Sequence, residues 1–255
     1  MIIPWRVDVP QVRIPAVNWL LILSIIFVFG LQYKSALDYS KEHDHRNAKM
    51  TYQERIKARE DAQKAIWAPF EPFVLEGLNV KGLVGHMWLH GGFLHLAGNM
   101  LFLWIFGNAV CAKVGNLRFL PIFLFAGIAG GAAQWITTEL PTIGASGAIN
   151  GIVGMYLVFF PTNDITCYFW LFIPPIFREF TVSSFWMIIF WFVFDLLGMV
   201  MGGGQVAYVA HIGGLATGML IGLIMLRFGW IKMERYERSL VEVFKGEKDP
   251  RGSTD

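Results

Sequence analysis

Long apolar segments recur along this chain of 255 residues, and they restrict it to folds that are built inside a lipid bilayer. A helix needs about 20 mostly apolar residues to cross the hydrocarbon core, or fewer where protein encloses part of it. Six segments meet this requirement: 16–31, 87–110, 119–136, 145–160, 184–201 and 207–228. The fourth is short and rich in glycine. The sequence therefore predicts an all-α polytopic membrane protein with six transmembrane helices.

The composition agrees with a membrane location. Only 16% of the residues are charged and 15% are aromatic, whereas soluble domains have about 25% charged residues. Basic residues alternate with acidic ones and the net charge is +2, so we expect the lipid bilayer as a partner and no nucleic acid. Cys111 and Cys167 form no motif, and we expect free structural thiols near cytosolic helix ends.

The polar segments divide the chain into three parts. We expect 1–15 to be a cytosolic N-terminal segment, 16–228 the membrane domain, and 229–255 a cytosolic tail that is frayed. The first apolar segment lacks a cleavage site behind it, which argues against a removable signal. Within the predicted external loop 33–81, Tyr52–Trp67 has the composition of a charged surface helix.

Charges in the short loops predict the orientation. The loops after the second, fourth and sixth spans contain Lys or Arg, whereas 137–143 and 202–205 contain neither. Because basic loops stay in the cytosol, both termini are expected there. We expect an integral multi-pass protein of a bacterial plasma (inner) membrane.

Four polar residues within the spans need an explanation, because polar groups are costly in lipid. They are Asn99 and His95 in the second span, Ser146 in the fourth and His211 in the sixth. Ser146, His211 and Asn99 lie 14 to 16 residues from the next cytosolic boundary. At about 1.5 Å per residue, this depth is roughly 21–24 Å for all three. We therefore expect them on one plane below the outer surface.

Ser146 begins the fourth span in the sequence Gly144-Ala-Ser-Gly147. The free N–H groups of a helix start suit a serine whose attack creates an oxyanion. Gly147 and Gly151 form a small-xxx-small pair, and this motif taken alone favours helix packing.

His211 precedes a stripe of glycines at 214, 218 and 222 on one face of the sixth span. If the fourth span packs there, glycine against glycine, Ser146 and His211 come within hydrogen-bond reach. A neutral imidazole could then accept the serine proton. A histidine that only bonds another helix is the alternative.

The second span carries His90, His95 and Asn99. His95 and Asn99 are four residues apart and share a helix face, so both can donate to one oxyanion. A metal site formed by His90, His95 and His211 is the alternative, but no carboxylate or cysteine completes it. We expect no metal and no cofactor.

These motifs together resemble the rhomboid family of intramembrane serine proteases. His-x4-His-x3-Asn, Gly-x-Ser-Gly and Ala-His-x2-Gly-x3-Gly occur in that order on spans two, four and six. The resemblance implies a six-transmembrane-helix rhomboid-like bundle with a short central fourth helix. It also implies a dyad of Ser146 and His211, with an oxyanion hole from His95, Asn99 and the Ser146 N–H. His90, Gly144 and Gly147 would have supporting roles.

Two departures from the family pattern concern Asn150 and the first external loop. Asn150 stands where some members have a tyrosine, and either bonding near the dyad or plain helix packing explains it. The Trp-Arg pair of many members is absent from 33–81, which puts the docking of that loop in doubt.

The fifth span carries Asp195, either as a third catalytic residue or as an interfacial carboxylate bonded to loop backbone. We expect the second, because the family dyad needs no acid. Residues 198–205 are expected to form a mobile cap over the site, with the fifth span as a side gate.

The sequence thus predicts a serine endopeptidase that cleaves transmembrane segments of other membrane proteins. A catalytically silent rhomboid-like protein that binds transmembrane clients is one alternative. A small transporter or channel is another, although it predicts a polar path through the membrane, whereas the polar residues here share one depth.

Overall fold

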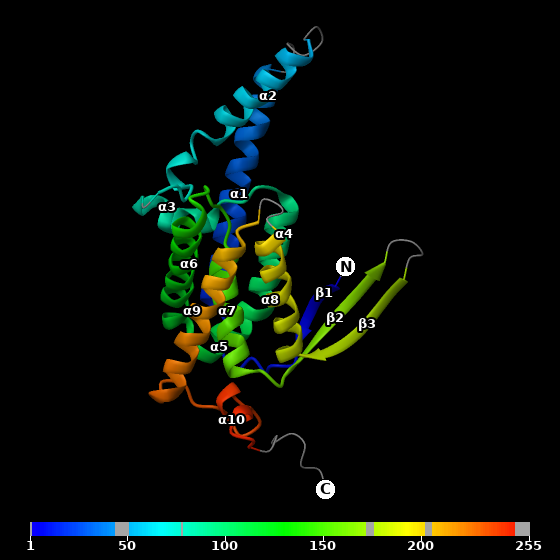
Figure 1. Ribbon diagram of the computed structural model, residues 1–255, viewed down its shortest axis with the longest axis vertical. Helices are drawn as coiled ribbons and strands as arrows, with labels where there is room; N and C mark the ends of the chain where they lie inside the picture. The colour runs from blue at the N-terminus through cyan, green and yellow to red at the C-terminus, as the bar shows by residue number, and fades with distance from the viewer. Residues whose placement is uncertain (1, 44–50, 78, 172–175, 202–205, 248–255) are drawn as a thin grey trace.

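The computed structural model describes residues 2–43, 51–77, 79–171, 176–201 and 206–247 (Figure 1). Within these ranges five helices are long and apolar enough to cross a membrane, and one shorter apolar helix joins them. The long helices are α1 (Ala16–His43), the rod from Phe93 to Val114, α6 (Asn116–Thr138), α8 (Ser184–Met201) and α9 (Tyr208–Arg227). The short helix is α7 (Ser146–Phe159). The chain is an integral multi-pass membrane protein, and the predicted six-span helical fold is confirmed.

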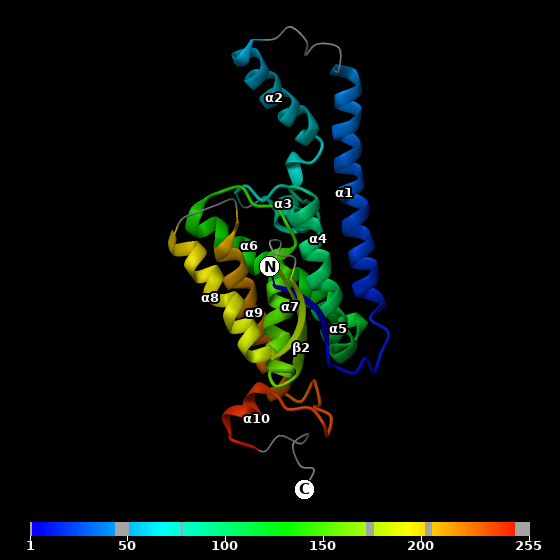
Figure 2. The same ribbon diagram turned by 90° about the vertical axis from the view of Figure 1, so that its right-hand side faces the viewer.

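Helix α7 lies at the centre of the bundle and is enclosed by the others (Figures 1 and 2). Every residue from Gly151 to Phe159 is buried. A helix that is apolar and buried all round belongs in a core. The central position predicted for the fourth span is therefore confirmed, and it explains why this helix can be short: protein surrounds its ends.

The rod that forms the second span consists of α4 (Phe93–Phe102), a π-helical turn η4 (Leu103–Gly107) and α5 (Asn108–Val114). A π turn frees a backbone carbonyl from the regular helix ladder. The side-chain amide of Asn18 donates to the Leu103 carbonyl at 2.8 Å and to Asn108 Oδ1 at 2.9 Å. Asn18 is fully buried, so these two bonds satisfy its amide nitrogen inside the bundle and fix α1 against the rod.

Several predicted boundaries differ from the observed ones. The second span begins at Phe93 and not at 87, because η3 (His86–Trp88) and the pair Gly91-Gly92 interrupt the helix. Helix α1 continues to His43, well past the predicted end at residue 31. It forms with α2 (Tyr52–Trp67) a hairpin that projects from one end of the bundle, the α2 end (Figure 2). The bounds of α2 are those predicted.

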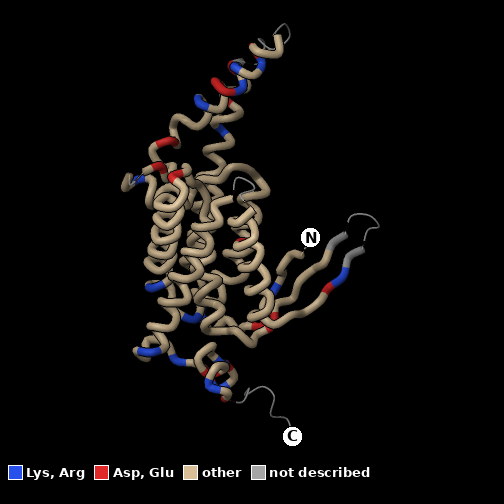
Figure 3. Tube along the Cα trace, in the orientation of Figure 1, with Lys and Arg blue, Asp and Glu red and all other residues tan. Residues whose placement is uncertain are grey.

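Short helices and turns complete the chain. They are η2 (Glu71–Phe73) and α3 (Val80–Gly85) at the α2 end, and α10 (Leu240–Phe244) at the opposite end, the α10 end. Charged residues gather at these two ends, in α2 and in the strands, whereas the middle of the bundle carries very few (Figure 3). This distribution matches a bilayer around the middle of the bundle.

A three-stranded antiparallel sheet, which the sequence analysis missed, stands beside the bundle (Figure 1). Its order is β1 (Ile2–Val7), β2 (Asp164–Leu171), β3 (Ile176–Ser183). The loop between spans four and five therefore forms a hairpin, and the N-terminal segment adds a strand to it. Cys167 lies in β2 and not near a helix end; it is a free, buried thiol, and burial raises its pKa to about 11.

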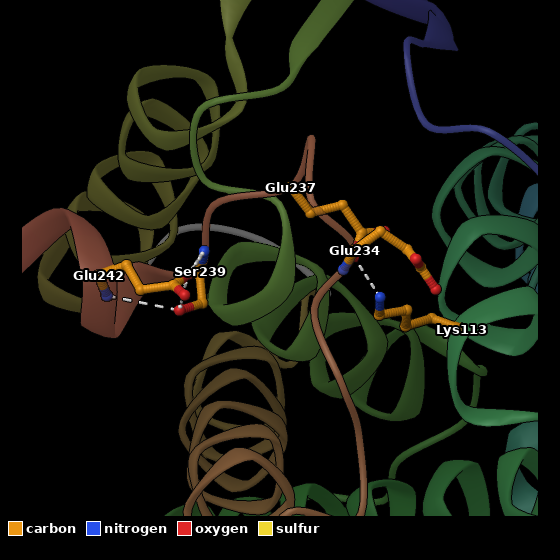
Figure 4. Close-up of polar contacts among 5 residues, drawn as sticks. All are labelled: Lys113, Glu234, Glu237, Ser239 and Glu242. Atoms are coloured by element: carbon orange, nitrogen blue, oxygen red, sulfur yellow. Dashed lines mark hydrogen bonds and ion pairs between the residues drawn. The ribbon is translucent and has the colours of Figure 1, made fainter. Parts of the chain in front are cut away.

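The C-terminal tail packs against the α10 end of the bundle, where it was expected to fray. Lys113 at the end of α5 forms a buried ion pair with Glu237 (Figure 4). Ser239 and Glu242 form the capping box that begins α10, and Leu240 is buried. The prediction of a frayed tail is therefore wrong for residues 232–247, while 248–255 lie outside the described residues.

Candidate active site

The catalytic candidates stand on α7 and α9, which touch backbone to backbone. A Cβ atom built on Gly214 would lie 1.9 Å from the Gly147 carbonyl oxygen, and one on Gly218 would lie 1.7 Å from that of Gly151. Real Cβ atoms essentially never approach another atom below 3.0 Å. Only glycine therefore permits this approach, and the two glycine faces meet as the sequence predicts.

This contact brings the starts of the two helices together. Gly147 directly follows Ser146, and Gly214 lies one helical turn after His211. Both Ser146 and His211 keep part of their surface exposed. Among the described residues no hydrogen bond joins the Ser146 hydroxyl to His211. Such catalytic bonds are often long before a substrate closes the site.

Ser146 is the first residue of α7, and no side chain caps this helix start. The first N–H groups of a helix lack intrahelical partners. The Ala145 carbonyl accepts from Ile149 N at 2.9 Å, which continues the ladder one turn further on. The helix start thus leaves backbone donors beside the Ser146 hydroxyl, where an attacking serine creates negative charge.

Gly144 allows His95 to pack against the backbone just before Ser146. Its φ is +116°, in the region that favours glycine, and a Cβ there would lie 2.8 Å from both Cε1 and Nε2 of His95. The same Cβ would lie 3.8 Å from the Asn99 side-chain nitrogen. The structure therefore brings His95, Asn99 and the Ser146 segment together.

His90 supports Asn99 through a direct hydrogen bond. The Asn99 amide nitrogen lies 2.9 Å from His90 Nε2, and His90 Nδ1 lies 3.3 Å from the Trp88 carbonyl. This pattern requires a proton on Nδ1 and a lone pair on Nε2 that accepts from Asn99. An amide has two N–H groups, so Asn99 retains one donor that can reach an oxyanion.

Asp195 on α8 contacts His211, contrary to our expectation. Both carboxylate oxygens lie 3.2 Å from His211 Nδ1. The contact matches the alternative in which Asp195 orients His211, while residues 202–205 of the loop lie outside the described residues. Sequence spacing gave no signal, because the contact depends on how α8 leans against α9.

Asn150 lies one turn below Ser146 on α7. Its amide nitrogen donates to the Ser146 carbonyl at 3.0 Å. The side chain also lines a cavity with Asp195 and His211, whose other walls are mostly apolar. Asn150 thus belongs to the surroundings of the histidine as well as to its own helix.

Sequence reasoning missed three buried polar residues that hold the site in place. Gln32 on α1 accepts from the His90 N–H at 3.2 Å, the His86 carbonyl accepts from the Gly144 N–H at 2.8 Å, and Gln134 on α6 accepts from the Ala210 N–H at 3.2 Å. Gln32 and Gln134 could have been found as polar residues in apolar helices.

The metal-site alternative has little support in the geometry. Both ring nitrogens of His90 have hydrogen-bonding partners. Across the part of the chain that the structure describes, no group of three or more His, Cys, Asp or Glu residues could hold a metal ion.

The predicted cap and gate are described in part. Residues 202–205 of the cap lie outside the described residues, and 198–201 belong to α8 and not to a loop. Trp191 of α8 packs against Phe102 of α4, with ring centroids 4.9 Å apart.

Comparison with known proteins places these features in a family. Residues 78–228 match the model of the Rhomboid domain. The chain is 31% identical over 151 residues to Rhomboid protein 1, mitochondrial, of Saccharomyces cerevisiae. The aligned residues cover 55% of this chain and 40% of the yeast protein. It is 49% identical over 69 residues to Rhomboid protease GluP of Bacillus subtilis. These residues cover 27% of this chain and 14% of the relative.

A third relative is RHOMBOID-like protein 4 of Arabidopsis thaliana, 31% identical over 166 residues that cover 62% of this chain and 38% of the relative. The chain thus spans less than half the length of each of these relatives. The Rhomboid domain match, however, covers more than half of the chain and extends from before the second span to the end of the sixth. The chain belongs to the rhomboid family.

Proposed function

We propose that this protein is an intramembrane serine endopeptidase that cleaves transmembrane segments of other membrane proteins. The observation that carries the proposal is the glycine contact between α7 and α9, which sets Ser146 beside the segment that carries His211. A relative whose name includes "protease" supports the same activity. The partners are membrane-embedded protein substrates, and no cofactor is required.

In this mechanism the Ser146 hydroxyl attacks the carbonyl of the scissile peptide bond while His211 takes its proton. The tetrahedral oxyanion accepts hydrogen bonds from His95, Asn99 and the backbone N–H of Ser146. His211 returns the proton to the leaving amine. Water then hydrolyses the acyl-enzyme with His211 again as base.

A substrate helix reaches the site sideways, between α4 and α8. It unwinds locally near Ser146, because acyl attack needs extended backbone, and small or helix-breaking residues there favour cleavage. Phe102 of α4 and Trp191 of α8 pack against each other between these two helices. Replacing Trp191 by alanine should therefore widen the proposed passage.

The protein lies in a bacterial plasma membrane. Both termini lie on the cytosolic side, and the hairpin of α1 and α2 lies on the outer side. The basic residues of the short loops near the α10 end support this orientation. A cysteine introduced at Glu60 should react with an impermeant maleimide on intact cells, and one at Lys245 only after lysis. The reverse pattern would overturn the orientation.

A serine-directed fluorophosphonate tests the chemistry. Purified protein should be labelled at Ser146, with labelling lost in both Ser146→Ala and His211→Ala. Cleavage of a transmembrane substrate should be lost in the same two variants, with their melting temperatures unchanged. Substrate binding without labelling would indicate a silent client-binding protein instead, and cleavage by Ser146→Ala would refute the nucleophile.

A further inference from the structure

Asp195 is an acid inside a membrane-spanning helix, where an ionisable side chain needs a partner. His211 supplies one: both carboxylate oxygens lie 3.2 Å from its Nδ1. The side chains of Asp195 and His211 keep 22% and 15% of their surface exposed. We propose that Asp195 is a positioning residue for His211, which holds the imidazole of the Ser146–His211 dyad in the form that acts as the base. This inference rests on the proposed function.

The contact selects one tautomer of the imidazole. A carboxylate only accepts hydrogen bonds, so Nδ1 must carry the proton that Asp195 binds. A neutral imidazole then has its lone pair on Nε2, the nitrogen that must take the proton from Ser146. Without Asp195, a proton on Nε2 becomes equally available, and that tautomer cannot act as the base.

The carboxylate also stabilises the charge that His211 acquires during attack. The cavity that Asp195 and His211 line has mostly apolar walls, including Phe102, Trp191 and Leu215. An imidazolium in such surroundings is unfavourable unless an opposite charge lies beside it. Because the acid is in place before the reaction, no reorganisation is needed as the charge forms.

The other titratable groups around His211 do not replace this acid. Tyr208 on the same helix has its ring centroid 6.4 Å from the imidazole. His95 on α4 is a second imidazole and supplies no negative charge. Asn150 on α7 is neutral. Within the described residues, Asp195 is the acid whose carboxylate contacts His211.

A purely structural role is the competing explanation, since the same contact joins α8 to α9. Gly198 offers a matched control for it. A Cβ on Gly198 would lie 2.3 Å from Tyr208 Cζ, so Gly198→Ala disturbs the same pair of helices without touching the carboxylate. A structural role predicts that Gly198→Ala and Asp195→Asn change kcat, KM and the melting temperature to a similar extent.

The experiment measures kcat, KM and melting temperature for the wild type, Asp195→Asn, Asp195→Glu and Gly198→Ala, with a purified transmembrane substrate. Asp195→Asn should lower kcat about 10- to 1000-fold with KM nearly unchanged. Asp195→Glu should recover part of the rate, and Gly198→Ala should leave the tautomer of His211 unchanged.

Nitrogen NMR of histidine-labelled protein gives a readout that needs no catalysis. The His211 signals, assigned with His211→Gln, should show the proton on Nδ1 in the wild type and a mixture of tautomers in Asp195→Asn. An unchanged kcat and tautomer in Asp195→Asn would overturn the inference while leaving the protease assignment intact. A wild type that neither cleaves nor labels would instead refute the proposed function, and the NMR result would still decide the role of Asp195.

Discussion

Alanine at Gly218 should separate the two helices that carry Ser146 and His211. The new Cβ would lie 1.7 Å from the Gly151 carbonyl oxygen and 2.5 Å from its carbon. Both are backbone atoms, so no side-chain rotation relieves the clash. The helices must move apart by more than an ångström to reach the shortest normal contact, 3.0 Å.

The expected loss of stability follows from two opposing terms. Overpacking of a tight core costs about 1–3 kcal/mol, and the upper end applies here because backbone is hit. Alanine in a helix returns at most about 1 kcal/mol relative to glycine. The net loss of about 2 kcal/mol should lower the melting temperature in detergent by roughly 4–8 °C.

The chemistry should suffer as well as the stability. A shift of about 1 Å between reacting groups can slow a reaction about 100-fold, so we expect fluorophosphonate labelling of Gly218→Ala to fall at least tenfold. Gly222→Ala should cause a smaller loss of stability and labelling, since its Cβ would lie 3.2 Å from the Val158 side chain, which can move. Gly30→Ala is the control, because a Cβ there has nothing within 4 Å.

The order of these three variants is the test. Thermal unfolding and the labelling rate should both rank Gly218→Ala below Gly222→Ala, with Gly30→Ala at or above the wild type. A Gly218→Ala protein that melts and labels like the wild type would refute the backbone contact. An equal loss in Gly30→Ala would show that the loss in Gly218→Ala does not come from the contact between α7 and α9.

Three further changes test other parts of the structure. Asn99→Ala should lower kcat by about 100- to 1000-fold by removing an oxyanion donor, and an unchanged kcat in a cleavage assay would contradict that role. Lys113→Met should destabilise the fold by about 3–5 kcal/mol, because it leaves the buried Glu237 carboxylate unpaired, whereas changing both residues to apolar ones should restore most of the loss; unfolding in denaturant measures both. When the purified protein is treated with a mild oxidant, Pro4→Cys should form a disulfide with Cys167, its cross-strand partner in β1 and β2, seen as a shift on a non-reducing gel. The same change one residue later should not form it.

Most of the helical architecture could be predicted because lipid leaves few choices. Apolar length alone located the spans, and the glycine spacing after His211 predicted which face of α9 meets α7. The start of the second span was placed too early because residues 87–90 are apolar enough for a helix. The glycines at 91 and 92 and the 3₁₀ turn before them interrupt it.

The sheet and the tail could not be predicted from local pattern. β1 and β2 lie far apart in the sequence, and Ile2 pairs with Phe169 only in the folded chain. The same holds for Lys113 and Glu237, which are separated by 124 residues. A charged segment near a terminus usually stays in solvent, and only a partner at the right depth makes its burial favourable.

Helix α8 carries Asp195 and also borders the proposed passage for substrate. Its packing differs between its two halves. Its first turn is fixed by Ser184, whose hydroxyl donates to the Asn163 carbonyl at 2.6 Å, and its buried residues, Ser184, Met187 and Ile188, all lie in its first half. The second half is held through Asp195 and through the contact of Gly198 with Tyr208. A substrate that displaces this half must therefore strain the Asp195–His211 contact. Losing the carboxylate should therefore act on the base directly, whereas Gly198→Ala disturbs the same half of α8 and leaves the tautomer of His211 unchanged.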